Sequence, residues 1–244
     1  MSGHNKWSKI KNKKGKEDAR KAKEFTKLGR AIMVAAKEGG ENPDYNASLQ
    51  TAIDKAKAIN MPNDNIMRAI KKGASGTDGD SFESLTYEGY GPSGIAVIVE
   101  CLTDNRNRTA PDVRHAFDKF GGNLGTNGSV SFMFSHLGVI LIDEKAYDAD
   151  KLMDDALETD VQDIKSEDGI VEIYTNIADF NNVKKYLEGK GYEFIDSDIM
   201  YVPSNYQKID DESGRKNMEK LIDLLEENDD VQNVYHNWEM EDEE

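Results

Sequence analysis

The sequence has little that would support a disulfide scaffold or a membrane anchor. It contains one cysteine, Cys101, so no intramolecular disulfide is possible, and the apolar residues around it predict a small buried thiol. The longest apolar run, at 95–99, is far shorter than the ~20 residues that span a bilayer, and no apolar core follows the N-terminal lysines. We therefore expect a cytoplasmic protein with no signal peptide, no membrane segment and no membrane partner.

Residue patterns typical of an active site are also missing. The four histidines are scattered, no Cys/His spacing fits a metal site, and no serine lies in a nucleophile elbow. A literal G-x-G-x-x-G string at 89–94 is followed by a β-branched run instead of a helix, so it predicts a hairpin turn and not a dinucleotide site. We expect a non-enzymatic protein without cofactor, metal or small-molecule substrate. The enzyme alternative is phosphate chemistry at Arg106 and Arg108 with His115 as the base.

Basic and acidic residues are divided unevenly along the chain. Residues 1–75 contain 17 lysines and arginines against 8 acidic residues, whereas residues 76–244 contain 14 against 39. The net charge of −16 therefore hides a basic first third. Because an acidic body repels phosphate, this asymmetry favours nucleic-acid contact through the basic part. The alternative is a solvated helical face.

The basic part is predicted to be a tail followed by helices. Residues 1–15 hold too little apolar surface to fold alone, so we expect a flexible basic arm that orders on its target. Apolar spacing then predicts a helical domain at 16–75, with helices over 16–39, 46–59 and 64–73. The polar, glycine-rich stretch 73–81 predicts a linker.

The predicted nucleic-acid contacts are cationic side chains and one tryptophan. On the first helix, five cationic residues fall within an arc of about 100° opposite the apolar stripe. Trp7 is expected either to stack on a base or to anchor the arm on the helical domain. The complete predicted set is Lys6, Trp7, Lys9, Lys11, Lys13 and Lys14 in the arm, Arg20, Lys23, Lys27, Arg30 and Lys37 on the first helix, and Arg106 and Arg108 further along.

The two arginines of that set lie in the segment TDNRNRT at 103–109. A strand is predicted to end before this segment and a helix to begin at 111, after a capping box at Thr109 and Asp112, so the segment reads as an anion-binding loop. The alternative is that Arg106 or Arg108 pairs with Asp104 or with a neighbouring domain and only fixes the loop.

The acidic part predicts an α+β fold in which one domain interrupts another. Strands are expected at 85–90, 95–103 and 129–134 with a helix at 111–120, followed by a βαββαβ series at 139–142, 146–157, 161–166, 170–174, 180–187 and 192–200. A last helix at 214–226 and strand at 231–235 are too few to form a core alone. We therefore expect a discontinuous α/β domain at 82–135 plus 202–238, with a ferredoxin-like domain inserted at 136–201.

Several long strings in this sequence are similar to the YebC/PmpR family. They are GHNKWSKIKNKK at 3–14, NMPNDNIMRAIKKG at 60–73, YEGYGPSGIAVIVECLTDNRNRT at 87–109, VRHAFDKFGGNLGTNGSVSFMF at 113–134, VPSNY at 202–206 and DDVQNVYHN at 229–237. The family is one of transcriptional regulators whose mitochondrial relatives activate translation of cytochrome c oxidase. The resemblance implies a helical domain and two α/β domains, with promoter DNA as target in some members and the translating ribosome, stalled at proline runs, in others. Asn5 and Pro111 depart from the usual family pattern.

The predicted function is therefore that of a nucleic-acid-binding regulator of gene expression. Its partner is promoter DNA or ribosomal RNA on the ribosome, and the sequence does not separate the two. A lysine-rich stripe favours contact with the phosphate backbone over base reading. The alternative is a protein-interaction adaptor whose acidic α/β body docks a basic partner. The sequence leaves the oligomeric state open.

Overall fold

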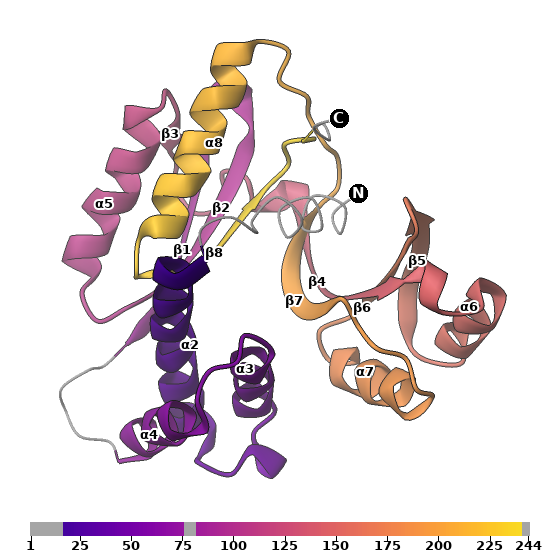
Figure 1. Ribbon diagram of the computed structural model, residues 1–244. Coiled ribbons are helices and arrows are strands. Elements are labelled where there is room, and N and C mark those ends of the chain that lie inside the picture. The colour runs from indigo at the N-terminus through magenta and orange to yellow at the C-terminus, as the bar shows by residue number, and fades with distance from the viewer. Residues whose placement is uncertain (1–16, 76–81, 241–244) are drawn as a thin grey trace. The chain divides into compact units, whose positions relative to one another are not determined.

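The computed structural model describes residues 17–75 and 82–240, with side chains from residue 22 onward (Figure 1). The described chain contains α-helices and two antiparallel sheets, which confirms the predicted α+β class. The described chain forms two compact units. The first unit holds residues up to 130 together with 209–236, and the second unit holds 131–208 together with 237–240. No described helix has the length and apolar character needed to cross a membrane.

The helical part of the first unit consists of α2 (Glu17–Gly39), α3 (Ala47–Ala58) and α4 (Asn63–Ala74), close to the predicted bounds. Buried Asn46 caps α3 by accepting from the backbone N–H of Leu49, and its amide donates to the Ala35 carbonyl on α2. A Cβ at Gly73 would lie 2.2 Å from the Met33 carbonyl oxygen, so only glycine lets α4 approach α2 this closely.

The first sheet has the strand order β3-β1-β2-β8, with β1 (Glu83–Tyr90), β2 (Ala96–Thr103), β3 (Asn123–Leu124) and β8 (Val231–His236). Strand β8 comes from the C-terminal part of the chain, as the sequence predicted. The G-x-G-x-x-G string covers the end of β1 and the turn to β2, which contains the 3-10 turn Pro92–Gly94 and no α-helix. Cys101 lies buried in β2, and burial raises the pKa of its thiol to about 12.

Two helices, α5 (Arg106–Lys119) and α8 (Glu212–Glu227), accompany this sheet (Figure 1). The predicted start of α5 was wrong, because the helix begins at Arg106 and Asn105 caps it by accepting from the Arg108 N–H. Thr109 is buried inside the helix, so the predicted capping box does not exist. Pro111 consequently lies in the second turn, where it removes one backbone hydrogen-bond donor.

The second unit is built from β4 (Phe134–Asp143), α6 (Ala149–Leu157), β5 (Val161–Glu167), β6 (Ile170–Thr175), α7 (Phe180–Gly189) and β7 (Asp196–Pro203). Its antiparallel sheet has the order β5-β6-β4-β7, and this βαββαβ succession is that of a ferredoxin-like unit. The β5–β6 hairpin turns at Asp168 and Gly169, both with positive φ, as a tight hairpin of this type requires.

The borders of the second unit differ from the predicted insertion at 136–201. The expected strand over 129–134 is absent, since Ser131–Met133 forms a 3-10 turn and β4 already begins at Phe134. Phe134 pairs with Pro203 at the end of β7. Beyond β7, Gln207 forms a parallel bridge with Trp238. Residues 131–135, 202–208 and 237–240 therefore belong to the same compact unit as the ferredoxin-like sheet.

Candidate nucleic-acid interface

Two lysines of the predicted stripe on α2 contact the C-terminal end of α8. The Nζ of Lys23 donates to the Glu227 carbonyl at 3.1 Å, and the Nζ of Lys27 donates to the Glu226 carbonyl at 2.8 Å. The last carbonyls of a helix have no partner within the helix and carry the negative end of its dipole. Both ammonium groups therefore cap α8, an engagement that the helical wheel did not predict.

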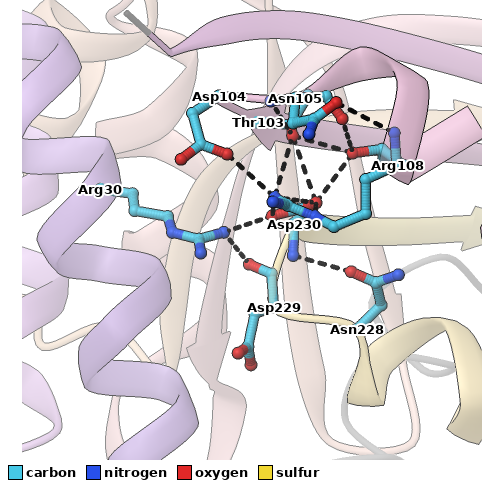
Figure 2. Close-up of polar contacts among 9 residues, drawn as sticks. Arg30, Thr103, Asp104, Asn105, Arg108, Asn228, Asp229 and Asp230 are labelled. Atoms are coloured by element: carbon cyan, nitrogen blue, oxygen red, sulfur yellow. Dashed lines mark hydrogen bonds and ion pairs between the residues drawn. The ribbon is translucent and has the colours of Figure 1, made fainter. Parts of the chain in front are cut away.

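Arg30, a further cation of the stripe, contacts the buried carboxylate of Asp230 (Figure 2). Its Nη1 donates to the Asp229 carbonyl at 2.6 Å and pairs with Asp230 Oδ1 at 2.8 Å. The Arg30 side chain is only 17% exposed. The predicted exposed stripe is thus corrected for Arg30, which lies within the first unit and faces Asp230 instead of solvent.

Asp230 binds four groups at once, although only 2% of it is exposed. Opposite Arg30, Nη2 of Arg108 lies 2.7 Å from Asp230 Oδ2, and Nε lies 3.1 Å from the same oxygen. The hydroxyls of Thr103 and Thr109 donate to Oδ2 at 3.2 and 2.8 Å. A buried carboxylate is tolerated only when it is paired and hydrogen-bonded in this way. Asp230 therefore joins α2, β2, α5 and the start of β8.

These contacts decide the charge of Asp230. Burial by itself raises the pKa of the carboxyl, but hydrogen bonds from Arg108, Thr109 and Arg30 outweigh it and hold the pKa below its ordinary value. Hydrogen bonds to Asp230 and Asp104 likewise raise the pKa of Arg108. These hydrogen bonds therefore favour the ionised form of the Asp230 carboxyl, which lies between two guanidinium groups.

The two arginines of the segment 103–109 have different surroundings. Arg108 pairs with Asp230 and also with Asp104 at 2.9 Å, which is the structural alternative foreseen for this segment, although 46% of its side chain stays exposed. Arg106 is exposed, and its guanidinium forms no hydrogen bond or ion pair with another described residue. Lys37 on α2 is exposed in the same way within the described chain.

The remaining predicted contacts lie outside the described side chains. They are Lys6, Trp7, Lys9, Lys11, Lys13 and Lys14 of the arm and the side chain of Arg20.

A cationic surface that the sequence analysis did not single out lies on α4. We define the α4 face as Met67, Arg68, Lys71 and Lys72, which are all exposed, while the opposite side of the helix is buried through Ile66, Ala69, Ile70 and Gly73. Met67 is 52% exposed. Arg68 contacts only the Asn65 side chain, at 3.4 Å, and Lys71 has no side-chain partner among the described residues. A helical wheel of 63–74 would have revealed this face.

Among the side chains of 22–75 and 82–240, no three from His, Cys, Asp or Glu come together in a way that could hold a metal ion.

Two protein-family models together match nearly the whole chain. The family model described as TACO1/YebC protein N-terminal domain matches residues 5–76, and the one described as TACO1/YebC second and third domain matches 82–238. The chain is 61% identical to a probable transcriptional regulatory protein of Finegoldia magna, covering 99% of this chain and 100% of the relative. A protein of the same description from Clostridioides difficile is 57% identical, covering 94% and 97%.

A solved structure agrees with these matches. The crystal structure of a conserved hypothetical protein from Aquifex aeolicus has a TM-score of 0.85 and 44% identity, covering 96% of each chain. The resemblance found in the sequence strings is thereby confirmed. With both family models matched and relatives more than half identical over almost their full length, this chain belongs to the TACO1/YebC family.

Proposed function

We propose that this protein regulates gene expression by binding the phosphate backbone of nucleic acid through the α4 face. Relatives named probable transcriptional regulatory proteins support a regulatory role. The observation that carries the site is the orientation of α4, whose cations face outward on a helix that is fixed by its buried side. Residues 22–75 hold nine cationic against six acidic side chains, whereas the chain as a whole carries −16.

The chemistry of the α4 face favours phosphate contact over base reading. Arg68, Lys71 and Lys72 follow one another along one helical surface, so their charges are presented along a line of phosphates. Met67 supplies exposed apolar surface beside them. Adenine is read in the major groove by asparagine or glutamine in bidentate pairs, and the four residues of this face include neither. The proposed target is therefore structured RNA or a weakly specific DNA site.

Other exposed cations extend the proposed interface. The arm residues Lys6 to Lys14, with Trp7, are included because of their composition. Lys37 and Arg106 are included because both are exposed. Lys23, Lys27, Arg30 and Arg108 are assigned a structural role in this proposal, since each is engaged inside the first unit.

Crosslinking in cells, followed by sequencing of the attached nucleic acid, tests this function and identifies the target. The sequences recovered from ribosomal RNA differ from those of promoter DNA, so the two targets can be distinguished. We expect the double variant Arg68→Ala with Lys71→Ala to recover far less nucleic acid than the wild type. The matched control is Lys145→Ala with Lys185→Ala, which removes two exposed positive charges from the second unit. Equal recovery by both double variants and the wild type contradicts the proposal.

A further inference from the structure

A hollow lined by both aliphatic and polar residues opens on the second unit between α6 and β5. It measures about 320 Å³ and is lined by Met153 and Leu157 of α6 and by residues 161–164 of β5. Leu157 is 66% exposed, a large apolar surface at the end of a helix whose inner side is buried. Val161 and Ile164 are half-buried and pack partly against the core of this unit. The hollow thus offers aliphatic surface that the unit itself leaves uncovered.

Strand β5 lies at the edge of its sheet. Within the described chain it pairs with β6 alone, so its other side has no neighbouring strand to receive its backbone groups. A register shift between Val161 and Asp163 places Gln162 in a bulge next to the hollow. Edges of this kind pair readily with an extended segment of another chain. Within the described chain, the outer edge of β5 is therefore open to an added strand.

The surroundings of the hollow are strongly acidic. Residues 131–208 contain 17 acidic against 7 cationic side chains. Asp154 and Asp160 are exposed next to the lining residues Met153 and Val161, and their carboxylates pair with no other described residue. Asp163, in the lining itself, accepts from the Ile164 backbone N–H at 3.0 Å and pairs with the exposed Lys165 at 3.6 Å. This charge attracts a cationic partner and repels a polyanion.

We propose that the hollow docks an extended, lysine- or arginine-rich segment of a partner protein, which adds to β5 as a strand. An aliphatic side chain of the segment packs against Leu157 and Met153, while its cations face Asp154 and Asp160. Each of the three observations specifies one property of the partner segment. The open strand edge fits an extended backbone, the aliphatic lining residues fit an aliphatic side chain, and the acidic residues beside the hollow fit positive charge. This docking goes beyond nucleic-acid binding and does not rest on it.

Two peptides that differ in only one respect test the proposal. The probe alternates lysine with isoleucine, and the control replaces each isoleucine by serine at the same charge. Fluorescence anisotropy with the full-length protein should give tighter binding of the lysine–isoleucine peptide. Leu157→Ser should weaken this binding about tenfold and leave the serine peptide unaffected, since the apolar contact is lost. Ile177→Ser, which alters another exposed aliphatic residue of the same unit, should change neither.

Amide NMR spectra locate the bound peptide. The proposal requires the largest shifts at 161–167, with slower amide exchange on the outer edge of β5. Equal binding of both peptides, unchanged binding by Leu157→Ser, or shifts spread over the acidic surface without β5 overturns it. Nucleic-acid binding measured on Leu157→Ser keeps the two proposals separate, because that variant leaves α4 untouched.

Discussion

The cationic side chains of the two helices α2 and α4 in the first unit have different surroundings. Both carry lysine and arginine opposite an apolar side, and a helical wheel gives them the same description. On α2, Lys23 and Lys27 cap α8, and Arg30 pairs with Asp230. Their charges therefore stabilise contacts within the first unit. On α4, the cations face outward. A wheel therefore identifies which side of a helix is polar, but not what covers that side.

The largest effect on stability is expected when the buried carboxylate of Asp230 is removed. Asp230→Ala removes the carboxylate that pairs with Arg30 and Arg108, and leaves the mostly buried Arg30 without a carboxylate partner while Arg108 keeps only Asp104. We expect a loss of about 3–5 kcal/mol in the free energy of unfolding, measured by urea denaturation. The control is Asp229→Ala, since only its backbone carbonyl is used and its exposed side chain is dispensable. Similar losses in the two variants would show that the pairing does not matter.

Acid should weaken the same cluster. The folded-state pKa of Asp230 lies below the ordinary value of 3.8, so its contribution to stability is present above that pH and is lost as the pH falls through the lowered pKa. We expect the urea midpoint of the wild type to fall more steeply below pH 4 than that of Asp230→Asn. Parallel curves for the two proteins would remove Asp230 from the acid response.

A smaller effect is expected for the lysines that cap α8. Lys23→Ala with Lys27→Ala should lower the free energy of unfolding by about 1 kcal/mol, because each exposed cation at a helix C-terminus contributes ~0.3–1 kcal/mol. Lys185→Ala, which removes an exposed lysine from the middle of α7, should leave stability unchanged. Thermal denaturation distinguishes these outcomes, and an equal change in both variants would reject the capping role.

Local patterns predicted most of the fold. Apolar spacing placed α3 and α4 to within one residue at each end, and the order of elements in the acidic part predicted both the βαββαβ succession and the return of β8. The start of α5 was missed because Pro111 and Thr109 resemble a helix beginning, whereas Asn105 provides the actual cap.

The candidate site was predicted less well, for a physical reason. Nothing in the sequence near Asp230 distinguishes it from the acidic residues around it, and its role depends on contacts with Arg30 of α2 and Arg108 of α5, which are both distant in the sequence. Which cation pairs with which anion is decided by tertiary packing. The α4 face, by contrast, follows from the spacing of residues 63–74, where the cations lie opposite the buried apolar residues.

The measurement that tests this account most directly compares the salt dependence of nucleic-acid binding in two double variants of equal charge. Binding to labelled RNA and DNA duplexes is titrated between about 50 and 200 mM salt. Arg68→Ala with Lys71→Ala should reduce the log–log slope by ~1.4–1.8, as expected for two lost phosphate contacts, while Lys23→Ala with Lys27→Ala leaves the slope unchanged. A reduced slope in the α2 variant together with an unchanged slope in the α4 variant would contradict the account.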